Sequence, residues 1–194
     1  MFIATVIASL SLGVAHFDDK PIKCAVMGSA TNAKSMSLEY EGAKYPMCCG
    51  GCPAAFTKDP GQYIEKAAKS DTTIGVFMFD PVSGVKLDWE KTTVSTDVKG
   101  MRYGFANEGE LKTFKAESDK FIKTPKKESL TCANSGEKID AYSAAGGYMD
   151  YKGVRYYFCC PDCLAAMKKD PEAVVAKGKA VVAEPKVMPT PKAK

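Results

Sequence analysis

The chain has 194 residues, which allows one medium-sized domain or several very small ones. Hydrophobic residues make up 45% of it and charged residues 26%, as in a globular protein. The net charge of +4 is carried by residues 177–194, which hold five Lys and one Glu. The remainder is balanced, with 22 basic and 22 acidic residues, and so lacks the basic surface of a dedicated nucleic-acid-binding protein.

Residues 1–15 are almost wholly apolar and end in the small residues Gly13-Val14-Ala15. This stretch is too short to cross a bilayer as a helix. It is typical of a secretory signal, although no Lys or Arg lies near Met1. We therefore predict a signal peptide over residues 1–15, a periplasmic or secreted location, and no stable membrane span once the signal is removed. A buried N-terminal helix or strand is the alternative.

Three segments of the chain follow one plan, which predicts an internal repeat. Each segment opens with a short turn that ends in Gly and continues to a hairpin with Gly at its turn. The opening turns are Cys24–Gly28, Asp80–Gly84 and Cys132–Gly136, and the hairpins turn at Gly42, Gly100 and Gly153.

A helix is predicted after each hairpin. Asp59-Pro60 and Asp170-Pro171 each supply a helix N-cap and a first helical position, and Gly178 is a C-terminal stop. Units of this size bury little apolar surface alone, so each needs a metal or a neighbour.

These signals predict an α+β fold of tandem modules, each a knuckle, a β-hairpin and a C-terminal helix. The modules cover residues 22–70, 76–123 and 130–178, joined by short polar linkers. Residues 179–194 contain Pro and Lys without an apolar period, so they are predicted to form a disordered basic tail.

All eight cysteines fall in the first and third modules: Cys24, Cys48, Cys49, Cys52, Cys132, Cys159, Cys160 and Cys163. Cys48 and Cys52 are expected at a strand end and a helix start, where free N–H groups stabilise a thiolate. The hairpin returns Cys24 beside them. Three convergent thiolates suit zinc or copper(I) better than hard cations.

We therefore predict one metal site at Cys24, Cys48 and Cys52, and a second at Cys132, Cys159 and Cys163. Cys49 and Cys160 are candidate extra ligands. In an extended chain successive side chains point to opposite sides, so either would face the metal only where the chain bends.

The cysteine pattern resembles the YHS/TRASH-like modules, small treble-clef-type units linked to heavy-metal handling. Their mark is a Cys, a spacer, and then Cys-x3-Cys preceded by Tyr-x-Phe. Tyr45-Pro46-Met47 and Tyr156-Tyr157-Phe158 stand in that lead-in position, and the spacers are slightly longer than usual. The resemblance implies tandem treble-clef-like modules, a zinc or copper(I) ion in each Cys-containing module, and attachment to metal transporters or enzymes in relatives.

The middle module has Asp80, Ala106 and Glu110 where the other two have the three cysteines. Two carboxylates raise the alternative of a hard-metal site. Asn107 and Glu110 stand at capping-box spacing, and Asp80 before Pro81 suits a turn. We predict capping and turn roles for these residues and no metal in the middle module.

Three other functions stay open from the sequence. An exported protein with an even number of cysteines can be stapled by disulfides. Cys49–Cys52 and Cys160–Cys163 are C-x-x-C pairs, which also occur in thiol oxidoreductases. A closed structural zinc site in an interaction protein would use the same ligands.

No catalytic constellation is recognisable, since the chain has a single histidine, no phosphate-binding glycine loop and no serine elbow. The prediction is a non-enzyme, exported, that captures, buffers or delivers zinc or copper through its Cys clusters. Its expected partners are the metal ion and a metal transporter or metalloenzyme, with no nucleic acid.

Overall fold

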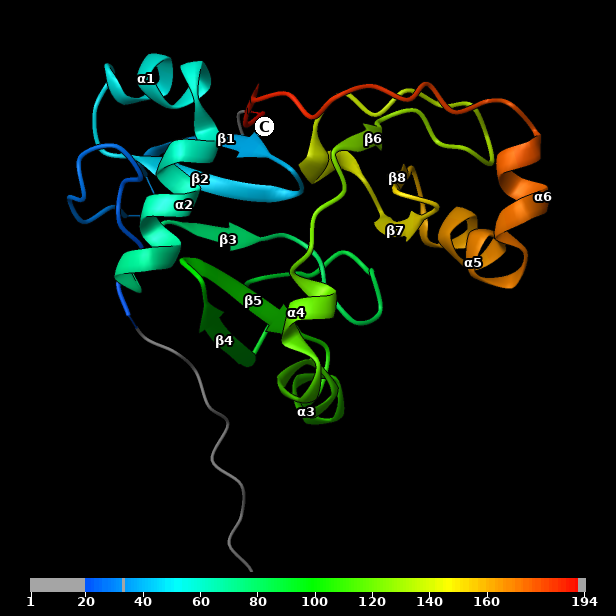
Figure 1. Ribbon diagram of the computed structural model, residues 1–194, viewed down its shortest axis with the longest axis horizontal. Helices are drawn as coiled ribbons and strands as arrows, with labels where there is room; N and C mark the ends of the chain where they lie inside the picture. Colours follow the sequence, from blue (N-terminus) through cyan, green and yellow to red (C-terminus); the bar gives the residue numbers. More distant parts are fainter. Residues whose placement is uncertain (1–19, 33, 192–194) are drawn as a thin grey trace, which may run out of the picture.

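The computed structural model describes residues 20–32 and 34–191, so the predicted signal peptide over residues 1–15 lies outside the described residues. The chain forms two β-sheets with helices packed against them, an α+β architecture (Figure 1). Within this described part, no helix is long and apolar enough to cross a membrane.

The larger sheet has the strand order β4-β5-β3-β2-β1-β9, and the smaller one has the order β6-β8-β7. The strands are β1 (Met36–Tyr40), β2 (Ala43–Met47), β3 (Gly75–Phe77), β4 (Val94–Val98), β5 (Met101–Phe105), β6 (Lys127–Ser129), β7 (Gly147–Tyr151), β8 (Val154–Phe158) and β9 (Met188–Pro189). The helices are α1 (Cys52–Lys58), α2 (Pro60–Ser70), α3 (Glu108–Ala116), α4 (Ser118–Phe121), α5 (Pro161–Lys169), α6 (Pro171–Ala176) and the short 3₁₀ helix η1 (Tyr142–Ala144).

The three opening turns share one hydrogen-bond pattern. The N–H of Cys24 donates to the carbonyl of Ser29, and the N–H of Gly28 donates back to the carbonyl of Cys24, both at 2.8 Å. Asp80 and Cys132 make the equivalent bonds, at 2.8 to 2.9 Å. The glycine that closes each turn has a positive φ, between 68° and 85°, which a residue with a Cβ adopts only under strain.

The three predicted hairpins are confirmed as the antiparallel pairs β1–β2, β4–β5 and β7–β8. At each turn two successive residues have positive φ, the second being Gly42, Gly100 or Gly153. Two such residues form the type I′ turn, whose twist matches that of the flanking strands.

The predicted helix signals are also confirmed. Asp59 caps α2 by accepting a hydrogen bond from the N–H of Gln62 at 3.1 Å, and Asp170 caps α6 through the N–H of Ala173 at 2.9 Å. Gly178 follows α6 with a φ of +65°.

One hydrophobic core runs through all three segments. It includes buried residues of the first two segments and continues into the third at Tyr142, Tyr148 and Tyr157. Phe77 and Tyr148 have ring centroids 5.4 Å apart, and Phe79 and Tyr157 lie 5.8 Å apart. A second, smaller cluster lies between β8 and α5. The three segments therefore share a core and pack on one another, and they do not form independent domains.

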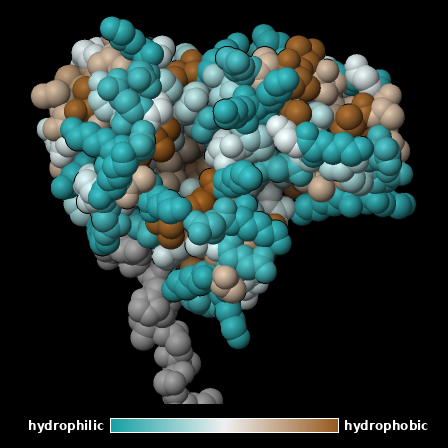
Figure 2. Space-filling model, viewed as in Figure 1, coloured by the Kyte–Doolittle hydropathy of each residue, from teal (hydrophilic) through white to brown (hydrophobic). Residues whose placement is uncertain are grey.

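A hollow of about 550 Å³ lies where the three segments meet. Figure 2 shows hydrophobic residues inside it, on the face that carries α2 and α4. Its aromatic walls include Tyr40, Tyr45, Phe77, Tyr103 and Phe121.

The C-terminal segment differs from the predicted disordered tail over residues 179–194. Glu128 and Ala183 form an isolated bridge, and β9 pairs antiparallel with β1. Thr190 also donates its N–H to the carbonyl of Ser37 at 3.2 Å. The prediction is wrong for residues 183–190, because edge strands offer unpaired N–H and C=O groups that a polar segment without apolar periodicity can satisfy.

Candidate metal centres

The first Cys triad joins three local elements. Cys24 starts the first knuckle, Cys48 directly follows β2, and Cys52 is the first residue of α1. Their Sγ atoms all lie within 4.8 Å of one another, and those of Cys48 and Cys52 are 3.7 Å apart. The predicted strand-to-helix junction thus brings the three expected ligands together.

The second triad repeats this arrangement. Cys132 starts the third knuckle, Cys159 follows β8, and Cys163 lies in the first turn of α5. The three Sγ atoms again lie within 4.8 Å of one another, with Cys159 and Cys163 separated by 3.7 Å. Within the described residues, these two triads are the groups of Cys, His, Asp or Glu that could hold an ion.

The sulfur spacing fits a tetrahedral thiolate site. Zinc–thiolate bonds of about 2.3 Å at tetrahedral angles put neighbouring sulfurs about 3.8 Å apart. The 3.7 Å separations in both triads match this value. All eight cysteines are free thiols in the structure, so every sulfur is available as a ligand.

The knuckle cysteines lie in a pocket of backbone N–H groups. Burial raises the pKa of Cys24, but hydrogen bonds from the N–H groups of Met27, Cys48 and Val26 outweigh it and lower the pKa to about 7. Each triad contains such a sulfur. At Cys132 burial also raises the pKa, and the Ser135 hydroxyl and three backbone N–H groups lower it to about 7.

The other sulfurs of the triads hold their protons more tightly. Burial raises the pKa of Cys52, and hydrogen bonds with Cys49, Cys24 and Cys48 raise it further. Burial likewise raises the pKa of Cys159. Near neutral pH each triad therefore has one readily ionised thiol, and a metal ion must displace protons from the others, which makes binding pH-dependent.

The two extra cysteines lie beside the triads. The chain leaves strand geometry after Met47 and bends at Cys48 and Cys49. The Sγ of Cys49 then lies 3.1 Å from that of Cys52, and the Sγ of Cys160 lies 3.9 Å from that of Cys159. The bend that a fourth thiolate ligand requires is therefore present in the first site.

The middle segment holds a carboxylate where the other two hold a knuckle thiol. Asp80 is fully buried, and its Oδ1 accepts hydrogen bonds from the N–H groups of Val82 at 2.8 Å and Ser83 at 3.1 Å. Its Oδ2 accepts from the N–H of Ala106 at 2.8 Å. These donors correspond in position to those around Cys24, so the same backbone pocket takes either a sulfur or a carboxylate.

Glu110 completes the middle site. A hydrogen bond with Asp80, together with burial, raises the pKa of Glu110 to about 7. Its main-chain N–H donates to Oδ1 of Asn107 at 3.0 Å, which confirms the predicted N-cap. Its carboxylate accepts from the N–H of Ala106 at 3.3 Å rather than from Asn107, so the predicted capping box is only half formed. Asp80 and Glu110 thus occupy positions that two of the three cysteines occupy in each of the other segments.

The sequence did not predict the bond between Asp80 and Ala106. The signal available was the positional match of Asp80 with Cys24 and Cys132, which indicates a common anionic group at the knuckle.

Comparison with known proteins gives no relative. No family model matches the chain, and neither a curated protein nor a solved structure matches it.

Proposed function

We propose that this chain is an exported metal-binding protein that holds one zinc or copper(I) ion at each Cys triad. The observation that carries the proposal is the duplicated set of three sulfurs within 4.8 Å, with two of them at the spacing of tetrahedral thiolates. Soft thiolate donors favour zinc and copper(I) over hard cations.

The middle segment favours metal binding for capture and delivery over metal binding that stabilises the fold. It keeps the knuckle, the hairpin and the following helix with Asp80 and Glu110 in place of thiols. The architecture is therefore compatible with a metal-free centre. Two metal centres beside a metal-free one are more readily explained by capture and delivery than by a need for stability.

The first site also has the accessibility that transfer requires. Cys24 and Cys52 are buried, whereas Cys48 and Cys49 are exposed. A ligand from a partner can approach the exposed sulfurs and replace them one at a time, while a closed site would exclude such exchange. We take the partner to be a metal transporter or a metalloenzyme that offers soft donors of its own.

The remaining features of the proposal come from the sequence. The three segments, residues 22–70, 76–123 and 130–178, are treble-clef-like modules of the YHS/TRASH type. Residues 1–15 direct the chain to a periplasm or to the exterior. The protein is not an enzyme.

A thiol-redox function is the second candidate. The Sγ atoms of Cys49 and Cys52 lie 3.1 Å apart in a C-x-x-C sequence, close enough for a small movement to join them. Its expected mark is an oxidised Cys49–Cys52 pair in the isolated protein.

Elemental analysis with thiol titration tests the proposal. Protein isolated from its own compartment, without added reductant, is expected to carry two metal equivalents and to show free thiols after chelation. Protein with neither bound metal nor titratable thiols would rule out metal binding and favour disulfides.

A further inference from the structure

Each hairpin places an acidic and a basic residue opposite each other across its two strands. The pairs are Glu39 with Lys44, Asp97 with Arg102, and Asp150 with Arg155. Residues paired this way have Cβ atoms about 4.5–5.5 Å apart, close enough for an ion pair.

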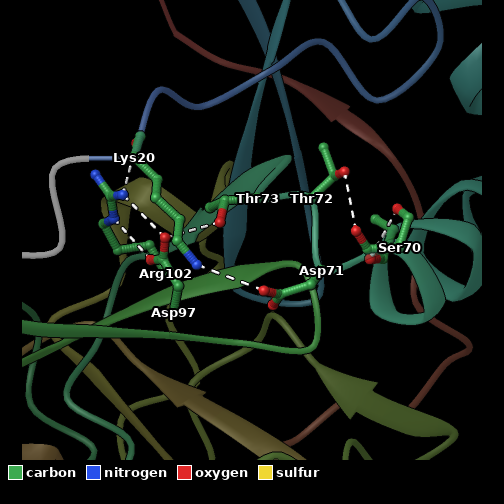
Figure 3. A network of polar contacts seen from close by, with 8 residues as sticks. Lys20, Ser70, Asp71, Thr72, Thr73, Asp97 and Arg102 are labelled. Carbon is green, nitrogen blue, oxygen red and sulfur yellow. Dashed lines mark hydrogen bonds and ion pairs between the residues drawn. The ribbon is translucent and has the colours of Figure 1, made fainter.

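The second and third pairs form two-pronged ion pairs. Arg102 donates from Nε and Nη2 to Asp97 at 2.8 and 3.0 Å, and Arg155 binds Asp150 at 2.8 and 2.9 Å. Figure 3 shows the Arg102 guanidinium against Asp97, with a second contact to the carbonyl of Lys20 at 2.7 Å. Arginine supplies the fork geometry that such a pair needs.

The first pair does not form. Glu39 is fully buried, and its Oε2 accepts a hydrogen bond from the N–H of Ser143 at 2.9 Å. Its Oε1 is buried with no hydrogen-bond partner among the described residues. Lys44 is exposed, and no ion pair joins it to the described part of the chain. A buried carboxylate oxygen without a donor is costly, so it marks a position where a donor is expected.

Glu39 lines a pocket of about 570 Å³ on the face of the larger sheet opposite α1 and α2. Tyr45 contacts Phe56 of α1 on one face of β2, and the alternation of the strand places Lys44 and Pro46 on the other. The pocket has apolar walls of Pro46, Val76, Met78, Leu87 and Trp89. Its volume is that of a small-molecule site.

Of the four basic side chains around the pocket, three form ion pairs or hydrogen bonds with other described residues. Arg102 binds Asp97, Lys20 binds Asp71 at 3.4 Å, and Lys86 donates to the carbonyl of Ser143. Lys44 alone of these four cations makes no ion pair or hydrogen bond that the described residues provide. The pocket thus combines an acceptor without a donor among the described residues, Oε1 of Glu39, with the cation of Lys44 and an apolar wall.

We propose that this pocket binds a free α-amino acid with a large apolar side chain. Its ammonium group donates to Oε1 of Glu39, and its carboxylate accepts from Lys44. Both groups of an α-amino acid are attached to one carbon, so they can bridge a cross-strand pair that does not close by itself. The apolar side chain lies against Leu87 and Trp89. This site is separate from the two Cys triads.

The only tryptophan of the chain is part of this pocket, which gives a direct test. Trp89 donates its Nε1–H to the carbonyl of Phe77 at 3.2 Å, so the ring is held in place. Titrating the full chain with L-phenylalanine or L-leucine, with excitation selective for tryptophan, is expected to give a saturable fluorescence change. Phenethylamine and 3-phenylpropionate, which each lack one charged group, are expected to bind at least about tenfold more weakly.

Three variants separate binding from folding, each checked for parental thermal unfolding. Glu39→Gln and Lys44→Met are expected to weaken L-phenylalanine binding by about tenfold or more, whereas the matched control Glu65→Gln, on the exposed side of α2, leaves it unchanged. Val76→Phe places a larger side chain in the apolar part of the pocket and keeps both charged groups. It is expected to abolish binding. Should Glu39→Gln not fold, Lys44→Met and Val76→Phe carry the test.

Any of three results would overturn the proposal. The first is no saturable change with either amino acid, and the second is equal affinity in the parent and in Lys44→Met. Equal affinity for phenethylamine and L-phenylalanine would also overturn it, because the ligand carboxylate would then contribute nothing.

Discussion

The backbone N–H of Ala106 donates a 2.8 Å hydrogen bond to Oδ2 of Asp80. Cys48 and Cys159 make the equivalent main-chain contact with the sulfurs of Cys24 and Cys132. One arrangement of N–H donors therefore holds a negative group in all three segments. The chemical difference between the Cys centres and the middle one lies in three side chains.

The first prediction converts the middle centre into a metal site. The combined change Asp80→Cys, Ala106→Cys and Glu110→Cys is expected to add one cobalt(II) equivalent, because all three positions correspond to the Cys triads. Thiolate-to-cobalt absorption measures the number of equivalents. The single change Asp80→Cys is the control and should add none. If the triple variant binds no more cobalt than the parent, the three centres are not equivalent.

The second prediction concerns pH. The pKa of Glu110 is about 7 in the folded chain and about 4.3 in an unfolded one, so the folded state binds the proton more tightly. Its contribution to stability is fully present below about pH 4 and is lost as the pH rises through about 7. Glu110→Gln should remove this loss, measured as a smaller fall in the free energy of unfolding between those pH values.

Glu128 provides the internal control for that experiment. Burial raises its pKa to about 7 as well, and it is present in both proteins, so its contribution cancels in the comparison. Identical pH dependence in the parent and in Glu110→Gln would contradict the raised pKa of Glu110.

The third prediction is that the two metal sites fill independently. Cys52→Ser should remove one metal equivalent and Cys163→Ser the other, because each sulfur belongs to one triad. Ser35→Ala, away from both triads, is a control that should retain both. Elemental analysis measures the number of metal equivalents in each variant. Loss of both equivalents in either Cys variant would refute two separate sites.

The fourth prediction concerns the buried ion pair of the middle hairpin. Arg102 and Asp97 have side chains that are 9% and 2% exposed, so Arg102→Met removes a two-pronged ion pair from the protein interior. We expect a loss of about 3–5 kcal/mol in the free energy of unfolding, measured by urea denaturation. Lys69→Met, which breaks an exposed ion pair with Glu65 on α2, should leave the free energy of unfolding nearly unchanged. A similarly small effect in both variants would show that the buried ion pair does not contribute to the stability of the fold.

Local signals account for what the sequence predicted. The knuckles, the type I′ hairpins and the Asp-Pro caps each depend on a few neighbouring residues with fixed backbone preferences, such as Gly42 or Asp59. The meeting of Cys24 with Cys52 followed from the same logic, because the hairpin between them fixes the path of the chain.

Contacts between distant segments could not be predicted in this way. Pairing of β9 with β1, the packing of Phe77 on Tyr148, and the contact of Glu39 with Ser143 join residues far apart in sequence. No local preference of these residues specifies the partner, since burial depends on how whole segments pack.

The pairing of β9 with β1 has a consequence for biosynthesis. β9 lies about 150 residues after β1 along the chain, so β1 is synthesised long before its partner strand. The outer edge of β1 therefore stays uncovered until β9 has been made, and in that interval it can pair with β1 of another nascent chain. Premature termination before residue 188 would leave that edge permanently open, so truncated products should aggregate while the full chain does not.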